Sequence, residues 1–500
     1  MSNIRVTYSA LISLFIRLIS ILSGTIFTLI VTRQLSVEEF GTWALISGIV
    51  IYAVIINPII NYWSTREIAR GEKSGSTAIF STGFFTIGGI VIYLVMAYFV
   101  GIESDVDLDI LLFAVILIPV MFFNDVLTAI NVGHKPHVTS YGFLVFEIIK
   151  ILAAIILIYF LKMGLEGVIA ASFFAYLGSI VILAIYAKPI VQSNFQQKYL
   201  KKWFKLFWLP TYRNLPSLIS LSDVLIFSIV TGSVVGVAYY TAAKTIGVLV
   251  NHTRSFSKGL YPKLLESQRQ EYLQETLIKM LYFAFPLISL SIVFAKPGLF
   301  ALNPIYQGAA TIVIFISIKS FLTTINKVFF QSLQGMENVD IKEESTFQDY
   351  LKSKLMWFPT FEIIRHGVYI IILFLMLNVL ISEDKSEFEL VLYWAIIGLI
   401  VEIPLTIYII RLVRKTFTLK IDFISLIKYI IISVAVFGGI HLVMEEFLEY
   451  KNRIFEFLPV LMLFALIGVI GYLGLTYVSD KKTKILFNAV LHELINKIRK

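Results

Sequence analysis

The chain has 500 residues, of which 58% are hydrophobic and only 15% are charged. A soluble globular protein has roughly 25% charged residues. The formal net charge is +9 and there is no Cys. These values exclude a soluble globular domain, a disulfide framework, a cysteine-based metal site and a thiol nucleophile. They indicate an integral membrane protein.

Apolar segments follow one another along the whole chain. A helix needs about 20 apolar residues to cross a bilayer, and segments of this length predict about fourteen transmembrane helices. The first, from Tyr8 to Val31, is too long for the apolar core of a signal peptide and contains Arg17, so we expect it to remain a membrane span. The predicted spans are residues 8–32, 41–63, 78–100, 109–132, 139–161, 166–187, 206–231, 236–257, 277–300, 308–333, 359–380, 389–410, 423–444 and 457–478.

The connecting segments alternate in charge. With the N-terminus in the cytoplasm, the inner segments carry about 27 Lys and Arg residues and the outer segments about six, the asymmetry that the positive-inside rule describes. We therefore expect a multi-pass protein of the cell membrane with both termini cytoplasmic. The net charge then needs no nucleic acid, because anionic membrane lipid is the expected partner of the basic loops and of the basic tail after Lys481.

Two short stretches of the chain are almost identical. Residues 146–150 read Phe-Glu-Ile-Ile-Lys and residues 361–365 read Phe-Glu-Ile-Ile-Arg, each in the fifth span of a set of six. An even number of spans separates the two sets, so both halves have the same orientation, as in transporters with a parallel repeat. The sequence thus predicts an all-α membrane protein with two six-helix lobes, at residues 1–187 and 188–410, and two further helices with a basic cytoplasmic tail at 411–500.

The repeat also aligns residues outside the two stretches. Asp125 and Gly133 match Lys327 and Gly335, and Arg17 matches Arg213. The offset is 202 residues for Asp125 and Lys327 but 215 for Glu147 and Glu362, which indicates an insertion of about 13 residues in the inner loop at residues 335–358.

Charged residues remain inside or near the ends of the predicted spans, where each is costly. The basic ones are Arg17, Lys150, Arg213, Lys244, Arg254, Lys319, Lys327, Arg365 and Lys428, and the acidic ones are Asp125, Glu147, Asp223, Glu362 and Glu402. Lys150 and Arg365 each follow a Glu by three residues, which indicates an ion pair within each helix or a direct role in substrate binding. The surplus of cations over anions predicts a bound anion, and phosphate is the natural one for Arg.

No pattern in the chain indicates an enzyme. There is no Gly-rich phosphate loop, no cluster of the His-x-x-Glu-His type, and no outer loop long enough for a catalytic domain. The alternating acids at Asp105, Asp107 and Asp109 are typical of a solvated loop, and His134 and His137 flank a cytoplasmic turn. We expect no metal, no cofactor and no catalytic residues.

Residues 33–45, Arg-Gln-Leu-Ser-Val-Glu-Glu-Phe-Gly-Thr-Trp-Ala-Leu, resemble the first inter-helix loop of polysaccharide flippases, and residues 236–244, Gly-Val-Ala-Tyr-Tyr-Thr-Ala-Ala-Lys, resemble its counterpart in the second repeat. The resemblance implies the Wzx-like branch of the MOP superfamily (multidrug, oligosaccharidyl-lipid and polysaccharide exporters). Such proteins flip undecaprenyl- or dolichyl-linked oligosaccharides to the outer leaflet by alternating access. A cationic central cavity lined by the first, second, seventh and eighth helices receives the substrate.

The resemblance assigns roles to the charged residues. Arg17, Arg213, Lys244 and Arg254 would bind the substrate, whereas the second span has no basic residue and departs from the family pattern. The residues expected to form ion pairs within each lobe, or to couple transport to its driving force, are Glu147, Lys150, Glu362, Arg365, Asp125 and Asp223. The expected partners are a lipid-linked oligosaccharide and proteins of glycan assembly, with the flippase itself a monomer.

Two other functions compete with this interpretation. A cation-coupled multidrug exporter of the MATE type would need acids in the first lobe, where Asp125 and Glu147 are available, but the surplus of cations argues against it. A membrane glycosyltransferase or polymerase would need a large outer loop with catalytic acids, which the chain lacks. Transport of a lipid-linked sugar in a reconstituted system separates the three.

Overall fold

The computed structural model describes residues 23–192, 194–205, 207–257, 260, 264, 270–336, 353–419 and 422–485, and no strand occurs among them. The chain divides into two compact units. Unit 1 contains Met1–Tyr239 and Ile370–Glu387, and unit 2 contains Tyr240–Tyr369 and Phe388–Lys500. Helices α11 (Val235–Gly247) and α17 (Lys354–Ser382) have residues in both units. The predicted lobe boundaries stay a prediction.

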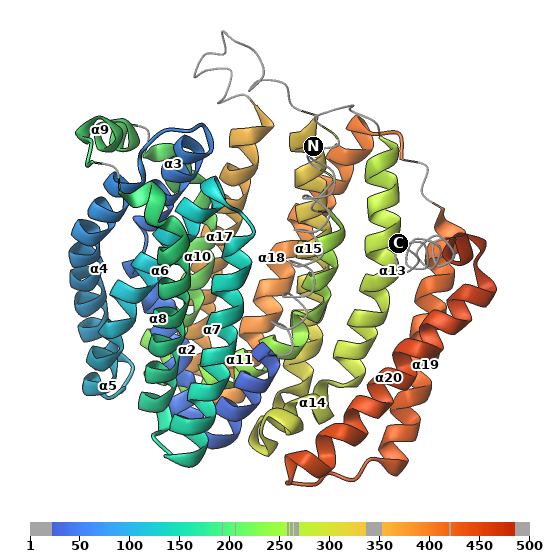
Figure 1. Ribbon diagram of the computed structural model, residues 1–500. Coiled ribbons are helices and arrows are strands. Elements are labelled where there is room, and N and C mark those ends of the chain that lie inside the picture. The colour runs from blue at the N-terminus through green and yellow to red at the C-terminus, as the bar shows by residue number, and fades with distance from the viewer. Residues whose placement is uncertain are drawn as a thin grey trace, which may run out of the picture. The chain divides into compact units, whose positions relative to one another are not determined.

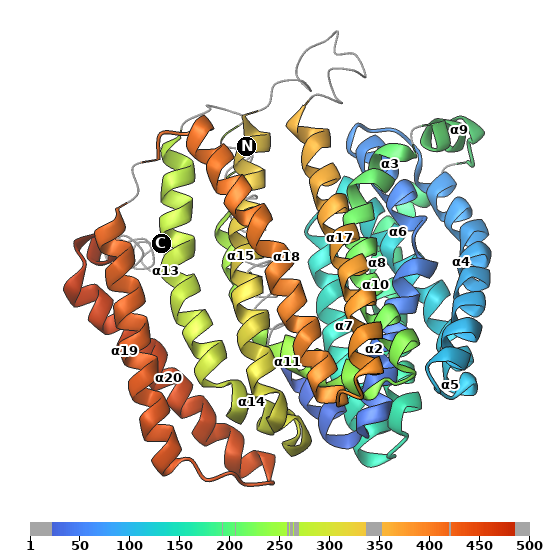
Figure 2. The same cartoon turned by 180° about the vertical axis from the view of Figure 1, so that it is seen from behind.

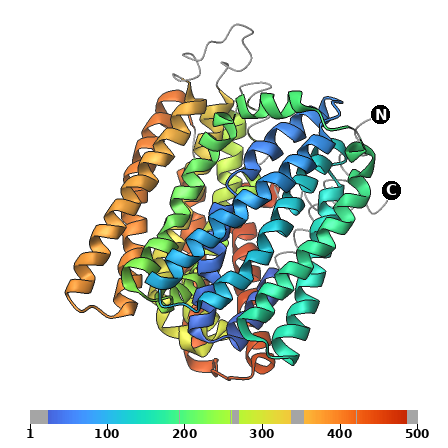
Figure 3. The same ribbon diagram turned by 90° about the vertical axis from the view of Figure 1, so that its left-hand side faces the viewer.

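Unit 1 is a bundle of long apolar helices (Figure 1). A helical stretch at residues 23–34 comes first. It is followed by α2 (Val37–Ala53), α3 (Asn57–Ala69), α4 (Gly75–Glu103), α5 (Leu108–Phe113), α6 (Leu117–His134), α7 (Val138–Ala154), α8 (Gly164–Val191), α9 (Gln197–Lys205) and α10 (Trp208–Thr231). Helix α6 packs against α3, α4 and α8, and α2 packs against α4 and α10. The side view shows that these helices are tilted (Figure 3).

Two irregular segments interrupt the helices of unit 1. Helices α2 and α3 meet at an angle of 58°, and Pro58 at the start of α3 has no N–H to give to the carbonyl of Val54, so the α-helix cannot run straight through. The end of α7 continues as a π-helix at Ile155–Phe160. Broken and π-helical segments inside membrane spans occur frequently at functional sites.

The loop that resembles a flippase motif has a defined structural role. Ser36 and Glu39 form a reciprocal capping box at the start of α2, and Glu39 Oε1 also accepts a hydrogen bond from the Leu165 amide at 3.1 Å. Gly41 lies against the turn between α10 and α11, where a Cβ atom would stand 2.1 Å from the Val234 carbonyl oxygen. The motif therefore fixes the start of α2 and lets that turn approach the helix backbone.

Helix α9 lies across the ends of α3 and α4 (Figure 1) and is held by polar contacts. The buried carboxylate of Glu67 on α3 accepts from the indole of Trp203 at 3.0 Å and pairs with Lys202 at 3.1 Å. The Tyr199 hydroxyl donates to Glu72 at 2.7 Å. Burial raises the pKa of Tyr199 to about 12, so it remains a hydrogen-bond donor at neutral pH.

Unit 2 also consists of long apolar helices. They are α13 (Glu271–Val293), α14 (Ala295–Leu302), α15 (Ala310–Gly335), the first part of α17, α18 (Glu387–Thr416), α19 (Phe423–Phe447) and α20 (Ile454–Ser479), with 3₁₀ segments at Leu249–Ser257 and Pro304–Ala309. One core cluster joins α13, α15, α17 and α18, with Val328, Phe358 and Ile409 nearly inaccessible. A second core cluster joins α13 and α14 to α19 and α20, which form an antiparallel hairpin (Figure 2).

Hydrogen bonds fasten the two helices of this hairpin at one end. Asp480 accepts from Ser425 Oγ at 2.9 Å, from the Tyr429 hydroxyl at 2.8 Å and from the Thr483 amide at 2.9 Å. Asp422, at the start of α19, pairs with Lys482 at 2.8 Å. The end of the hairpin that carries both aspartates is thus closed by two carboxylates with several donors each.

Eleven helices in the described part of the chain are long and apolar enough to cross a membrane, or twelve when the bent pair α2 and α3 counts as one span. The chain is therefore a multi-pass membrane protein. The predicted count of about fourteen is not reached, for two reasons. The first predicted span, residues 8–32, lies largely outside the described residues, and the eighth, 236–257, ends as an α-helix at Gly247 and continues as a 3₁₀ segment. The predicted loop insertion at 335–358 also lies largely outside them.

Candidate functional site

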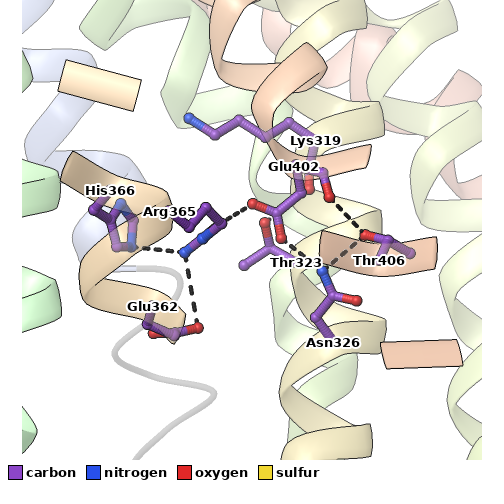
Figure 4. Close-up of polar contacts among 8 residues, drawn as sticks. All are labelled: Lys319, Thr323, Asn326, Glu362, Arg365, His366, Glu402 and Thr406. Carbon is purple, nitrogen blue, oxygen red and sulfur yellow. Dashed lines mark hydrogen bonds and ion pairs between the residues drawn. The ribbon is translucent and has the colours of Figure 1, made fainter. Parts of the chain in front are cut away.

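A buried network of charged and polar side chains joins three helices of unit 2 (Figure 4). At its centre is Arg365 of α17, whose side chain is only 9% exposed. It forms ion pairs with Glu402 of α18 and, at 3.7 Å, with Glu362 one turn earlier on its own helix. The ion pair that the sequence spacing predicts is therefore present, but Arg365 also has a second carboxylate from another helix.

Polar groups from α15 and α18 surround Glu402, which is 1% exposed. Asn326 Nδ2 donates to Glu402 Oε1 at 2.7 Å and contacts Thr406 Oγ1 at 2.8 Å. Arg365 Nη2 lies 2.6 Å from His366 Nε2. Since a guanidinium can only donate, this imidazole nitrogen accepts, and the ring is neutral in this arrangement. His366 therefore adds no charge to the network.

More basic than acidic side chains share this region. The charges of Arg254, Glu362 and Arg365 all act on Lys327 of α15, and Glu362 also acts on Arg254. Lys319, eight residues before Lys327 on α15, contributes a fourth basic group, which acts on His366 together with Lys327 and Arg365. Arg254, Lys319, Lys327 and Arg365 thus exceed Glu362 and Glu402 by two positive charges. We call these six residues the cationic cluster.

Close packing positions the Lys319 side chain. A Cβ atom at Gly398 of α18 would stand 2.7 Å from Lys319 Nζ, so the glycine leaves the space that the ammonium group uses. The ammonium lies 4.9 Å from the centre of the Tyr369 ring, a cation–π contact. The Tyr369 hydroxyl accepts from the Trp394 indole at 2.7 Å, and Trp394 stacks on Tyr240 with ring centres 3.8 Å apart. The aromatic groups therefore hold one cation of the cluster in a defined place.

One acceptor is missing from the cationic cluster. The Nε–H of Arg365 is buried and has no hydrogen-bond partner among the described residues. A buried donor without an acceptor costs roughly 1–3 kcal/mol. A phosphate oxygen is the kind of acceptor that a guanidinium binds best.

Unit 1 contains the matching pair from the repeat. Lys150 pairs with Glu147 at 2.7 Å, and Ser23 donates a hydrogen bond to the same carboxylate. The Lys150 ammonium also lies over the rings of Phe27 and Phe146, at 5.2 and 5.0 Å. Here one cation balances one anion, whereas basic groups outnumber acids in the cationic cluster. The two Glu–cation pairs therefore hold the same place in the repeat but lie in surroundings of different net charge.

The repeat extends to a neighbouring amide. Asn124 precedes Asp125 as Asn326 precedes Lys327. Asn124 Oδ1 accepts from Ser179 of α8 at 2.7 Å, whereas Asn326 donates to Glu402 of α18. Sequence reasoning named Asp125 and Lys327 as a matched pair but missed the role of Asn326, and the adjacent asparagines were the available signal. It also missed His366 and Thr406, which no spacing rule singles out.

The remaining predicted site residues are not brought together. Arg17 lies outside the described residues. Arg213 of α10 and Lys244 of α11 are exposed, and Asp223 of α10 is buried and bonded to the Val224 amide at 2.9 Å. Asp125 accepts from Asn57 at 3.0 Å. No group of three His, Cys, Asp or Glu side chains that could hold a metal ion occurs in the described part of the chain.

Comparison with solved structures shows the fold. The chain is similar to an inward-facing multidrug resistance MATE family transporter of the MOP superfamily, with a TM-score of 0.59 and 13% identity over 81% of this chain and 98% of that one. It is also similar to a MATE protein in a straight conformation (TM-score 0.51, 13% identity, 82% and 95% covered) and to a mutant of the Vibrio cholerae MATE transporter VcmN (TM-score 0.51, 12% identity, 82% and 96% covered). No protein-family model matches the sequence, and no curated protein matches it. The chain therefore has the fold of MATE transporters of the MOP superfamily.

Proposed function

We propose that this protein is a membrane transporter that flips a polyprenyl-phosphate- or pyrophosphate-linked oligosaccharide from the cytoplasmic to the outer leaflet. The observation that carries the proposal is the cationic cluster, in which four basic side chains outnumber two acids. All of them except Arg254, which lies in the 3₁₀ segment Leu249–Ser257, are on helices long and apolar enough to cross a membrane. Desolvated charge is costly in a bilayer, so an unbalanced cluster favours an anionic ligand.

The chemistry of the cluster fits a phosphate group. Arg365 is fixed between two carboxylates and still has an unused Nε–H, while Arg254 and Lys327 lie in the same region and are only half-buried. A guanidinium offers phosphate a planar set of donors and an ammonium offers a point charge. A lipid phosphate entering this region would be met by both kinds of donor.

The transport mechanism follows from the fold and the repeat. MATE-type lobes related by a parallel repeat can expose a ligand alternately to the two sides of the membrane. A ligand drives such a change only if it binds one conformation more strongly than the other. Arg17 and Arg213, which hold matching places in the sequence repeat, stay predicted contacts to the phosphate, and Lys244 stays a predicted contact as well.

The test is flipping by the purified full-length protein in proteoliposomes. A fluorescent lipid-linked oligosaccharide is placed in both leaflets, and a sugar-modifying reagent outside reports the rate at which label becomes accessible. We expect Lys327→Met and Arg254→Ala to slow flipping at least about tenfold, because each removes a charge-assisted contact worth roughly 1.5–3 kcal/mol. Lys279→Met is the matched control, because this side chain is 45% exposed and pairs with Glu275.

Wild-type flipping rates in Lys327→Met and Arg254→Ala, at equal protein incorporation, would contradict the proposal. So would a wild-type protein that exports an organic cation and does not accelerate the movement of the lipid. That second outcome would favour a MATE-type multidrug exporter, which the fold and the acidic side chain of Asp125 support.

A further inference from the structure

A largely apolar groove of about 600 Å³ lies within unit 2. It is lined by the first half of α13, the second half of α15, the end of α18 and the start of α19. Buried residues of the core, such as Leu277, Phe329 and Val413, line it together with partly buried ones such as Leu281. Pockets that hold small molecules have about 300–1,000 Å³, so the groove is large enough for a ligand. None of the six residues of the cationic cluster lines it.

A fixed loop closes one end of the groove. Gln270 Oε1 accepts hydrogen bonds from the amide and from the hydroxyl of Thr418, each at 2.9 Å, and Thr418 itself lines the groove. At the same end, Phe423 and Ile424 at the start of α19 are 61% and 70% exposed. Apolar side chains that are exposed on a membrane helix contact lipid tails. The groove therefore borders on the bilayer.

Basic side chains gather at this end of the groove. Arg411, Arg414 and Lys415 are exposed in the last turns of α18, and Arg414 lines the groove. The acids at the neighbouring helix ends are Glu271, Glu275 and Asp422, of which Glu275 pairs with Lys279 and Asp422 with Lys482. Glu271 alone does not balance three basic groups, so the end of α18 keeps a positive charge.

The apolar lining and the positive end together select the occupant. An empty apolar groove beside lipid loses dispersion contacts that a lipid tail restores. The tail alone does not distinguish one lipid from another, but basic pockets between transmembrane helices on the cytoplasmic side bind anionic headgroups. The charge asymmetry of the loops predicts that this end of α18 is cytoplasmic. A phospholipid places its phosphate near such a helix end and its acyl chains in the hydrocarbon beside the groove.

We propose that the groove binds an anionic phospholipid of the cytoplasmic leaflet. One acyl chain lies along Leu281, Ile325 and Ile410, and the headgroup phosphate binds the guanidinium of Arg414, which offers it a planar set of donors. The bound lipid fills the space between the end of α18 and the start of α19, and so helps to hold the hairpin of α19 and α20 on unit 2. The site is separate from the cationic cluster and does not depend on which cargo the protein carries.

The test uses the purified full-length protein in nanodiscs that contain phosphatidylglycerol with a photoreactive diazirine in one acyl chain. After irradiation, peptide mass spectrometry compares the labelling of the groove residues with that of the exposed face of α4. We expect labelling to be higher in the groove, and unlabelled phosphatidylglycerol to compete with it better than phosphatidylcholine does. Arg414→Gln should reduce groove labelling at least about threefold, because it removes a basic group that attracts the headgroup. The matched control is Arg70→Gln, an exposed arginine at the end of α3, which should leave labelling unchanged.

A second variant tests the position of the acyl chain. Ile278→Trp places a larger side chain in the groove without changing its charge, and should also reduce labelling at least about threefold; where this variant does not fold, the exposed Arg414→Gln variant decides. Groove labelling no higher than that of α4, or unchanged in Arg414→Gln, would overturn the proposal. Equal competition by phosphatidylcholine would remove the headgroup selectivity, and stronger competition by a polyprenyl phosphate would assign the groove to the carrier lipid instead. Both results would also overturn it.

Discussion

Arg365 of α17 pairs with two carboxylates that differ in burial, Glu362 on its own helix and Glu402 on α18. Glu402 is almost inaccessible, whereas the Glu362 side chain is 21% exposed. Because Glu402 is shielded from water, its negative charge is stabilised mainly by the guanidinium. Water can replace part of the interaction at Glu362. The two carboxylates therefore have unequal roles, although spacing in the sequence suggests only the pair with Glu362.

We expect Arg365→Met to lower the free energy of unfolding by about 3–5 kcal/mol, since it leaves the Glu402 carboxylate buried without its cation. Adding Glu402→Gln should restore most of this loss, and Glu362→Gln alone should cost much less. Denaturant or thermal unfolding in detergent measures the wild type and these variants, together with Glu402→Gln alone. Equal losses from Glu362→Gln and Glu402→Gln would contradict the unequal roles.

Gly41 illustrates how a single residue can set a contact between elements. A methyl group there would clash with the Val234 carbonyl, whereas one at Gly88 of α4 would meet no heavy atom within 4 Å. We expect Gly41→Ala to destabilise the protein by about 1–3 kcal/mol through the forced separation, and Gly88→Ala to be neutral or to stabilise by up to about 1 kcal/mol. Denaturant or thermal unfolding in detergent measures both variants. A Gly41→Ala variant as stable as Gly88→Ala would refute the assigned contact.

Among the elements, the hairpin of α19 and α20 carries a pH dependence of known sign. The hydrogen bond from Lys482 lowers the pKa of Asp422 to about 2, with help from Ser425. For Asp480, burial alone would raise the pKa, but hydrogen bonds from Thr483, Tyr429 and Ser425 outweigh it and the pKa is lowered. A carboxyl group whose pKa is lowered by folding stabilises the fold at pH values above its pKa in the unfolded state, which is near 4. The stabilisation is lost as the pH falls toward the pKa in the folded state.

We therefore expect the stability difference between the wild type and Asp480→Asn to be constant above about pH 5 and to shrink as the pH falls below about 4. Thermal midpoints between pH 3 and pH 7 measure this difference, with Asp384→Asn, in the loop between α17 and α18, as the control. A difference that grows on acidification would show that the sign is wrong.

Element boundaries were predictable where apolar runs end in charged or turn residues. The predicted spans 423–444 and 206–231 correspond to α19 (Phe423–Phe447) and α10 (Trp208–Thr231). The bend between α2 and α3 was not predicted, because the apolar run continues through it and only Pro58 marks the break. The contact of Arg365 with Glu402 joins residues 37 positions apart on different helices, and no periodicity within one helix reveals such a contact.

For the whole molecule, the charges of the connecting segments predict an orientation with both termini in the cytoplasm. The cysteine-free chain allows single cysteines to be placed at described, exposed positions. We expect Asn452→Cys, between α19 and α20, to react with an impermeant thiol reagent in intact cells, and Lys415→Cys, at the end of α18, to react only after permeabilisation. The reverse pattern would invert the topology and place the basic loops outside.

The length of α18 has a consequence for the lipid around the protein. Its 30 residues span about 45 Å, while the hydrocarbon core of a bilayer is about 30 Å thick. Acidic residues occupy its first turn and Arg411, Arg414 and Lys415 its last turns, so only the stretch between them matches the hydrocarbon. Shorter acyl chains would make this stretch too long and force the helix to tilt. The depth of Glu402 in the membrane, and with it the solvation of its ion pair, is thus set in part by the acyl-chain length of the host bilayer.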